Sequence, residues 1–266
     1  MIADVSSLGR VRGGRVTLGR VVIAEWIKFL TIPSNPICLG VAFVALAGFG
    51  PAAALSRALS GEGAARPFGT GDALVSVQGV QLLVAVVGAV YFASEFLYGG
   101  IRPSVLAVPG RLQLVVAKAF VLVAAVFVIG AAGALVTLSI VPLALGADAS
   151  FDLPPRLAAR LVIGTGLELA AIGMLALGIG GLVRSVTGSV VAVLALLGFA
   201  PFALAVVPVA WLQNLAVWLP SAAGLAVLQG EGGAKSVGPW EGLGVSFCWA
   251  VAALVLAAVT LVRRDA

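Results

Sequence analysis

The chain has 266 residues, of which 61% are hydrophobic and only 10% are charged, and its formal net charge is +5. A soluble globular domain carries about 25% charged residues, so this composition cannot cover a water-exposed surface. Histidine is absent and cysteine occurs only as Cys38 and Cys248. This composition argues against zinc sites and against cysteine–histidine nucleophile pairs. We therefore do not expect the chain to be an enzyme. We expect both cysteines to be buried and unpaired.

Six apolar runs are each long enough to cross a hydrocarbon core of about 30 Å as a helix. The runs lack the two-residue alternation of a lipid-facing strand, and the 34 glycines would let helix backbones approach closely. The predicted fold class is therefore all-α, a polytopic membrane protein. The predicted spans are 37–56, 73–93, 114–145, 161–183, 189–207 and 243–262.

The distribution of Lys and Arg predicts the orientation of these spans. Most of the 16 basic residues fall on one side if both termini are cytoplasmic, and cells retain such residues in the cytoplasm beside short loops. We expect a multi-pass protein with a flexible basic arm at 1–19 and a single transmembrane domain at 20–266.

The stretch 208–230 is apolar enough to suggest a seventh span. It contains Trp211, Gln213, Asn214 and Trp218, however, and tryptophans that flank amides fit the membrane interface better than its centre. We therefore expect a broken or re-entrant helical pair at the outer face.

Residues 20–31 form an amphipathic pattern at helical spacing. Trp26 lies on the apolar half with its isoleucine and leucine neighbours, and Glu25 and Lys28 lie on the polar half. The pattern predicts an interfacial helix whose cation faces anionic lipid, serving either as a simple membrane entry or as a contact for a cytoplasmic partner.

Three polar residues inside the spans are candidates for a translocation path: Glu168, Gln78 and Gln81. An ionised carboxylate in a membrane costs about 2.5–3.5 kcal/mol on insertion scales, so Glu168 needs a partner or a proton. Gly164 and Ala171 share its helix face, which favours tight packing there. A structural hydrogen bond and a role in moving substrate or protons both remain open.

The connector 94–111 between the second and third spans carries Glu95, Arg102 and Arg111. Pro103 can begin a short helix in it, and Pro109 followed by Gly110 can end that helix. Such a connector is either an ordinary positively charged loop or a contact surface.

Three segments resemble a known family. Glu95-Phe96, Gly99, Arg102, Pro109, Arg111 and Ala117-Lys118 resemble the first cytoplasmic connector of type 2 ATP-binding-cassette (ABC) exporter permeases, especially actinobacterial ones. Ala24-Glu25-Trp26-Ile27-Lys28 is similar to the family's interfacial elbow helix, and Leu219-Pro220-Ser221-Ala222-Ala223-Gly224 is similar to the segment before its last span. The sequence departs from the family at Leu97, where a basic residue is usual.

The resemblance implies a half-transporter of a bacterial cytoplasmic membrane that exports an amphipathic or lipid-like compound, such as a drug, a peptide antibiotic or a lipid. It would dimerise with a second copy or a sister permease and bind two copies of a cytoplasmic ABC ATPase. Glu95, Arg102 and Arg111 would then couple to that ATPase.

The resemblance also implies that ATP and Mg²⁺ bind to the ATPase partner. This chain has no complete phosphate loop, because Gln229 and Ala234 occupy positions that require glycine, and no nucleic-acid partner is expected. The rival reading is an ion-coupled secondary carrier or a channel that uses Glu168.

Overall fold

The computed structural model describes residues 17–60, 68–99, 111–146, 151, 153–228 and 238–263. Every regular element in these ranges is helical, and six helical stretches are long and apolar enough to span a membrane, which confirms the all-α polytopic fold. They are α2 (Ser34–Ser60), α4 (Ser76–Ala93) running into η3 (Ser94–Gly99), α6 (Arg111–Leu145), α7 (Pro155–Val183), the run of α8 (Val186–Leu194), η4 (Ala195–Phe199) and α9 (Ala200–Val206), and α12 (Pro239–Arg263).

The fourth span begins earlier than its apolar run predicts, at Pro155 rather than at residue 161. Pro155 occupies the first turn of α7, where its fixed φ suits a helix and its missing N–H costs nothing. The helix ends at Arg184, whose left-handed backbone (φ 57°, ψ 18°) stops it. Ser185 then caps α8 by accepting a hydrogen bond from the backbone N–H of Gly188 at 3.4 Å.

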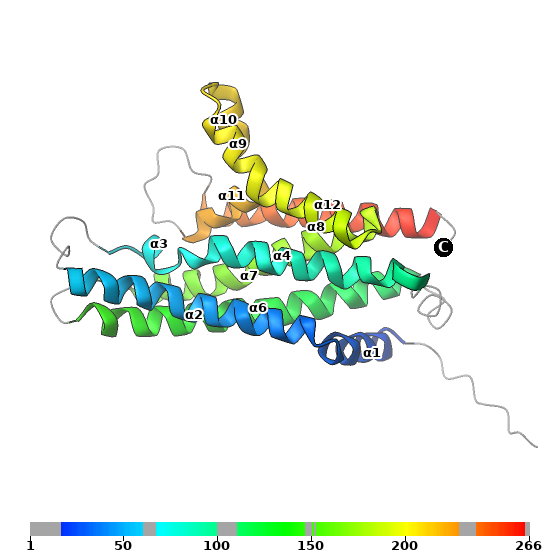
Figure 1. Cartoon of the computed structure of the whole chain (residues 1–266), viewed down its shortest axis with the longest axis horizontal. Coiled ribbons are helices and arrows are strands. Elements are labelled where there is room, and N and C mark those ends of the chain that lie inside the picture. Colours follow the sequence, from blue (N-terminus) through cyan, green and yellow to red (C-terminus); the bar gives the residue numbers. More distant parts are fainter. Residues whose placement is uncertain are drawn as a thin grey trace, which may run out of the picture.

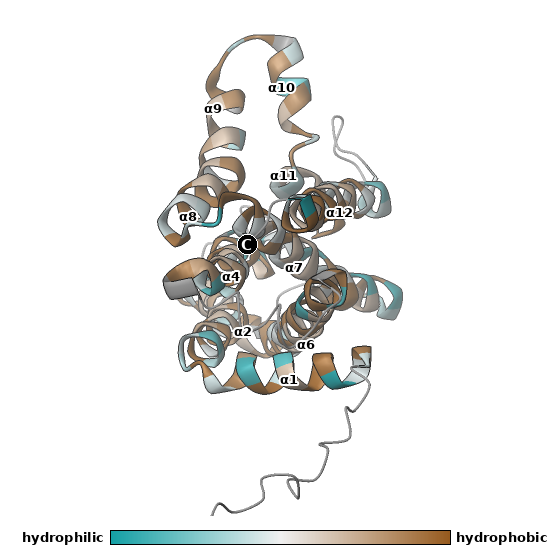
Figure 2. Cartoon of the chain, turned by 90° about the vertical axis from the view of Figure 1, so that its right-hand side faces the viewer, coloured by the Kyte–Doolittle hydropathy of each residue, from teal (hydrophilic) through white to brown (hydrophobic). Residues whose placement is uncertain are grey.

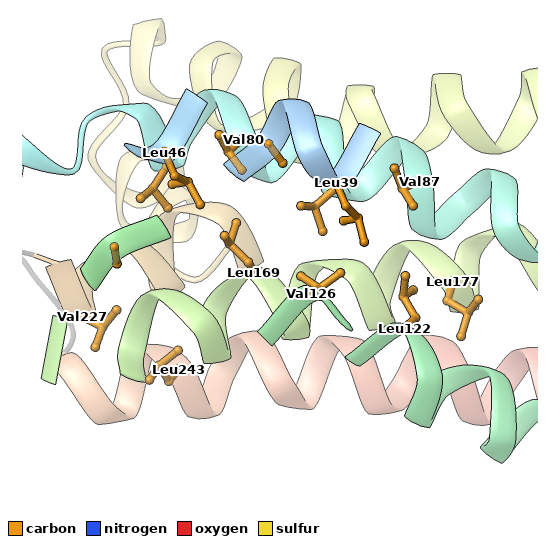
Figure 3. Packing of buried hydrophobic residues seen from close by; sticks show 14 of the residues in the cluster. Leu39, Leu46, Val80, Val87, Leu122, Val126, Leu169, Leu177, Val227 and Leu243 are labelled. Carbon is orange, nitrogen blue, oxygen red and sulfur yellow. The ribbon is translucent and has the colours of Figure 1, made fainter. Parts of the chain in front are cut away.

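Helix α7 lies at the centre of the bundle and packs against α4, α6 and α12, as the end-on view in Figure 2 shows. Leucines and valines from several helices meet around it (Figure 3), among them Leu122 and Val126 of α6 and Leu169 and Leu177 of α7. Large apolar side chains also cover the outside of the spans, as lipid contact requires.

Glycine permits the closest helix approaches at this centre. A Cβ on Gly88 of α4 would meet the carbonyl oxygen of Gly173, and one on Gly180 of α7 would meet the carbonyl oxygen of Ala89. Because lipid supplies no hydrophobic drive between helices, such close backbone packing is a principal source of association.

The chain between α8 and α12 is broken into short helices. After α9 come α10 (Ala210–Ala216), α11 (Pro220–Gly224) and η5 (Leu225–Leu228), and the short helix α3 (Thr70–Ala73) lies near the last of these. Helices α9 and α10 project away from the bundle, whereas α11 returns to it (Figure 1). The prediction that 208–230 forms broken helices and not a continuous seventh span is confirmed for residues 208–228. The hydroxyl of Ser246 on α12 donates to the carbonyl of Pro220 at 2.8 Å and helps fix α11 in place.

Helix α1 (Leu18–Thr31) lies crosswise at one end of the bundle, which we call the α1 end, and the last turn of α12 lies at the same end (Figures 1 and 2). The opposite end carries α3 and α11 and is called the α11 end. The amphipathic helix predicted at 20–31 is present. The prediction turned its polar half toward lipid headgroups, whereas the structure turns part of that half toward the other helices. Glu25 is buried against the bundle, and Ile23, Trp26 and Ile27 are exposed on the other side.

Several predicted features lie wholly or partly outside the described residues. These are residues 1–16 of the arm, residues 100–110 of the connector with Arg102, and the glycine-rich residues 230–236. Both cysteines are free, but the expected burial is wrong for Cys248, which is exposed on α12, and Cys38 is half-buried. A thiol is apolar enough to lie on the outer face of a membrane helix at little cost.

Candidate functional site

Five side chains from distant parts of the sequence form a charge cluster at the α1 end. Helix α1 supplies Glu25 and Lys28, the end of α4 supplies Tyr91, η3 supplies Glu95, and the start of α6 supplies Lys118. The Lys118 ammonium donates to the Glu25 carboxylate at 2.6 Å and lies 2.9 Å from Oε1 of Glu95. Lys28 also donates to Glu95 and lies 3.7 Å from Glu25.

The charge cluster is balanced and largely removed from solvent. Two ammonium groups face two carboxylates, and the Lys118 side chain is 0% exposed. Tyr91 donates its hydroxyl to Glu25 at 3.0 Å, and its ring lies 4.3 Å from the Lys118 nitrogen. Removing a charge from water is expensive unless it is paired, so each member depends on the others.

Lys28 lies at the edge of the charge cluster, on the helix that precedes the first span. Burial lowers the pKa of its ammonium, the positive charge of Lys118 lowers it further, and Glu25 opposes the change. The Lys28 side chain contacts two protein carboxylates and stays 37% exposed, so a contact between its charge and anionic lipid remains a prediction.

Of the three residues predicted to couple to an ATPase, only Glu95 has a described side chain. Glu95 is buried, at 6% exposed, and its visible partners are Lys28 and Lys118. Arg111 is the first residue of α6, and Arg102 lies outside the described residues. A role for Glu95 in coupling would consequently act through the charge cluster and not by direct contact.

Glu168 lies at the middle of the central helix α7 and is 0% exposed. Neither carboxylate oxygen accepts a hydrogen bond of ordinary geometry from the described residues, although the Ser246 hydroxyl of α12 lies beside the carboxyl group. A Cβ on Gly224 of α11 would overlap that group. A Cβ on Gly164, one turn earlier, would meet Val227 of η5. The predicted tight packing on this face is confirmed, and its partner is the segment α11–η5.

Gln78 and Gln81 of α4 lie together, on the wall of a groove formed with η4, α9 and α11. Glu168 does not line this groove, so the three expected path residues are not brought to one place. Ser221 of α11 also lines the groove, beside the two glutamines. The sequence placed Ser221 in the segment before the last span and gave no sign of this contact.

Sequence reasoning also missed the pairing of Lys118 and Tyr91 with Glu25. One signal was available for Lys118, because a lysine within an apolar run needs a partner. Tyr91 carried no comparable signal. Within the described ranges, no group of three or more Cys, Asp or Glu side chains could hold a metal ion.

No family model matches this chain, and no curated protein matches it significantly.

Proposed function

We propose that this chain is the permease subunit of an ATP-driven exporter that works with separate ABC ATPase subunits in a bacterial cytoplasmic membrane. The observation that carries the proposal is the charge cluster. Glu25 and Lys28 belong to one segment that resembles the family, and Glu95 and Lys118 belong to another, yet all four side chains meet in one contact.

The charge cluster gives this proposal a mechanical basis. Glu95 lies in η3, at the start of the connector that also carries Arg102, and it is bound to α1 through Lys28 and to α6 through Lys118. A push on the connector by an ATPase would therefore displace α1 and α6 together with it. Nucleotide binding could in this way shift the bundle between inward and outward access.

Both permease copies of the proposed dimer would carry this linkage, and each copy would bind one ATPase subunit. The copies would be two of these chains or this chain and a sister permease. The cargo would be an amphipathic or lipid-like compound, because the spans offer mostly apolar side chains with few polar points.

The test asks whether the reading frame next to this chain's encodes an ATPase and whether that ATPase co-purifies with the chain, followed by measurement of cargo-stimulated hydrolysis. The double variant Arg102→Ala and Arg111→Ala should weaken association by tenfold or more, since truncating one member of a desolvated interface pair costs about 2–5 kcal/mol. Arg263→Ala, at the end of α12, is the matched control. Undiminished ATPase association and transport in the double variant would sink the coupling assignment.

Glu168 supports a second candidate, an ion-coupled carrier. A fully buried carboxyl group with the neutral hydroxyl of Ser246 beside it could bind a proton or a cation during transport. In proteoliposomes with an imposed pH gradient and no ATPase, a carrier would transport cargo, and Glu168→Gln would abolish this transport with the fold intact. If Glu168 is structural, Gln should be tolerated better than Leu.

A further inference from the structure

A groove of about 490 Å³ lies between α4, the run η4–α9 and α11, and is partly open on one side. Two of its walls belong to membrane spans, those of Ser76–Leu97 and Val186–Leu204. A molecule in the groove would therefore lie against two spans, close to the start of the first, where it could enter from the lipid.

Two polar side chains of the groove wall lack partners. Gln81 is 4% exposed and Ser221 is 2% exposed, and the carbonyl oxygen of the first and the hydroxyl of the second make no hydrogen bond to the described residues. Buried polar atoms are normally paired, so each of these atoms points to a missing partner. A change of side-chain rotamer at either residue would turn its polar atom toward a ligand in the groove.

The remaining wall sets the character of that ligand. None of the residues that line the groove is charged, and Leu82, Leu197, Phe202 and Leu225 supply apolar surface beside the polar side chains. A charged headgroup would be desolvated there without a counter-ion, whereas a neutral headgroup with O–H or N–H donors would satisfy the unpaired oxygens.

The groove is held open by small residues and by an irregular helix. Gly79 and Gly198 both line it, and a Cβ on Gly79 would meet nothing within 4 Å, while one on Gly198 would touch only the tip of Leu82, at 3.8 Å. Gly198 lies in η4, a π-helical turn, and such turns are frequent at functional sites.

We infer that this groove binds a neutral amphipathic molecule, whose hydroxyl or amide headgroup is held by Gln81 and Ser221 and whose apolar chain lies along Leu82, Phe202 and Leu225. This molecule is the cargo if the proposed export function holds, and that identification rests on the proposed function. Binding itself does not depend on it.

The experiment uses the full chain in phosphatidylcholine nanodiscs without any ATPase, so that a failure here is distinct from a failure to bind the ATPase. The probe is a monoacylglycerol with a diazirine in its acyl chain, which carries two hydroxyl donors. Its dimethyl ether, which carries none, and the corresponding fatty acid, which is anionic, are the comparison probes. We expect the monoacylglycerol to label peptides of α4, η4 and α11 about tenfold more than either comparison probe.

The variants test the groove directly. Gln81→Leu combined with Ser221→Ala should remove the preference for the monoacylglycerol over its ether. Gly79→Leu and Gly198→Leu should fill the groove and block labelling, whereas Gly244→Leu, at another position where a Cβ meets open space, should leave labelling unchanged. Thermal denaturation of each variant establishes that its fold is retained.

Adding unlabelled diacylglycerol, a neutral bilayer lipid with a free hydroxyl, to the discs tests whether the ligand is a membrane lipid or a separate molecule. Loss of labelling in these discs would show that a neutral lipid with a glycerol headgroup occupies the groove, and retained labelling would show selectivity for a separate molecule. Equal labelling by all three probes, or labelling that survives both glycine substitutions, would overturn the inference, because contact with bulk lipid explains either result.

Discussion

The ammonium group of Lys118 lies 2.6 Å from the carboxylate of Glu25, although 93 residues separate the two in the sequence. This contact joins the interfacial helix α1 to the third span. Lys118 also contacts Glu95, which lies at the end of the second span. The orientation of α1 is thus set by ionic contacts with the bundle, while its isoleucines and Trp26 face outward.

Lys118→Met should destabilise the protein by about 3–5 kcal/mol, because it leaves two carboxylates without their shared buried cation. The measurement is denaturation of the purified chain in detergent. Arg263→Met, which removes an exposed cation at the end of α12, should have little effect. Adding Glu25→Gln to Lys118→Met should recover part of the loss; if the two losses simply add, the residues are not energetically coupled.

Arg184 joins three elements while it holds a left-handed backbone conformation. Its guanidinium donates to the carbonyl of Thr260 on α12 at 3.0 Å and lies 5.2 Å from the ring of Phe96 in η3. Arg184→Ala should lose these contacts and keep the strained backbone. Arg184→Gly should be about 1 kcal/mol more stable than Arg184→Ala, since glycine adopts this conformation freely. Thermal melts of both variants decide the order, and equal stability would contradict the assignment of strain.

Gly224→Ala should destabilise the chain by about 1–3 kcal/mol, because the added methyl group would overlap the carboxyl group of Glu168. Gly244→Ala is the control, since a Cβ there meets open space. The double variant Gly224→Ala with Glu168→Ala should relieve the overlap and regain stability. Failure of that rescue in denaturation measurements would mean that Gly224 is required for another reason.

The predicted orientation can be tested with single cysteines in a chain carrying Cys38→Ala and Cys248→Ala. Ser60 ends α2 at the α11 end, and Leu18 begins α1 at the other end; both are exposed. Ser60→Cys should react with a membrane-impermeant thiol reagent in intact cells, and Leu18→Cys should react only after lysis. The reverse pattern would overturn the assignment of cytoplasmic termini.

The spans could be predicted from the sequence because each is a continuous apolar run, and the helical break at 208–230 because its tryptophans and amides interrupt one. The start of α7 at Pro155 could not, since Arg156 and Arg160 end the apolar run on its N-terminal side before the helix itself ends. The contacts of Glu25, Lys28 and Glu95 were missed for a different reason. Helical periodicity shows which residues share a face, but not whether that face meets lipid, water or protein.

All charged members of the cluster lie within the first 118 residues, so they emerge from the ribosome before any of the central helix α7. Helix α1 and the spans α2, α4 and α6 could therefore lock into register early in synthesis, leaving room for α7 to insert among them. The contact between Glu168 and Gly224 must close later, after α11 has been made. Biogenesis would thus proceed in two stages, with ionic contacts fixing the first and small-residue packing completing the second.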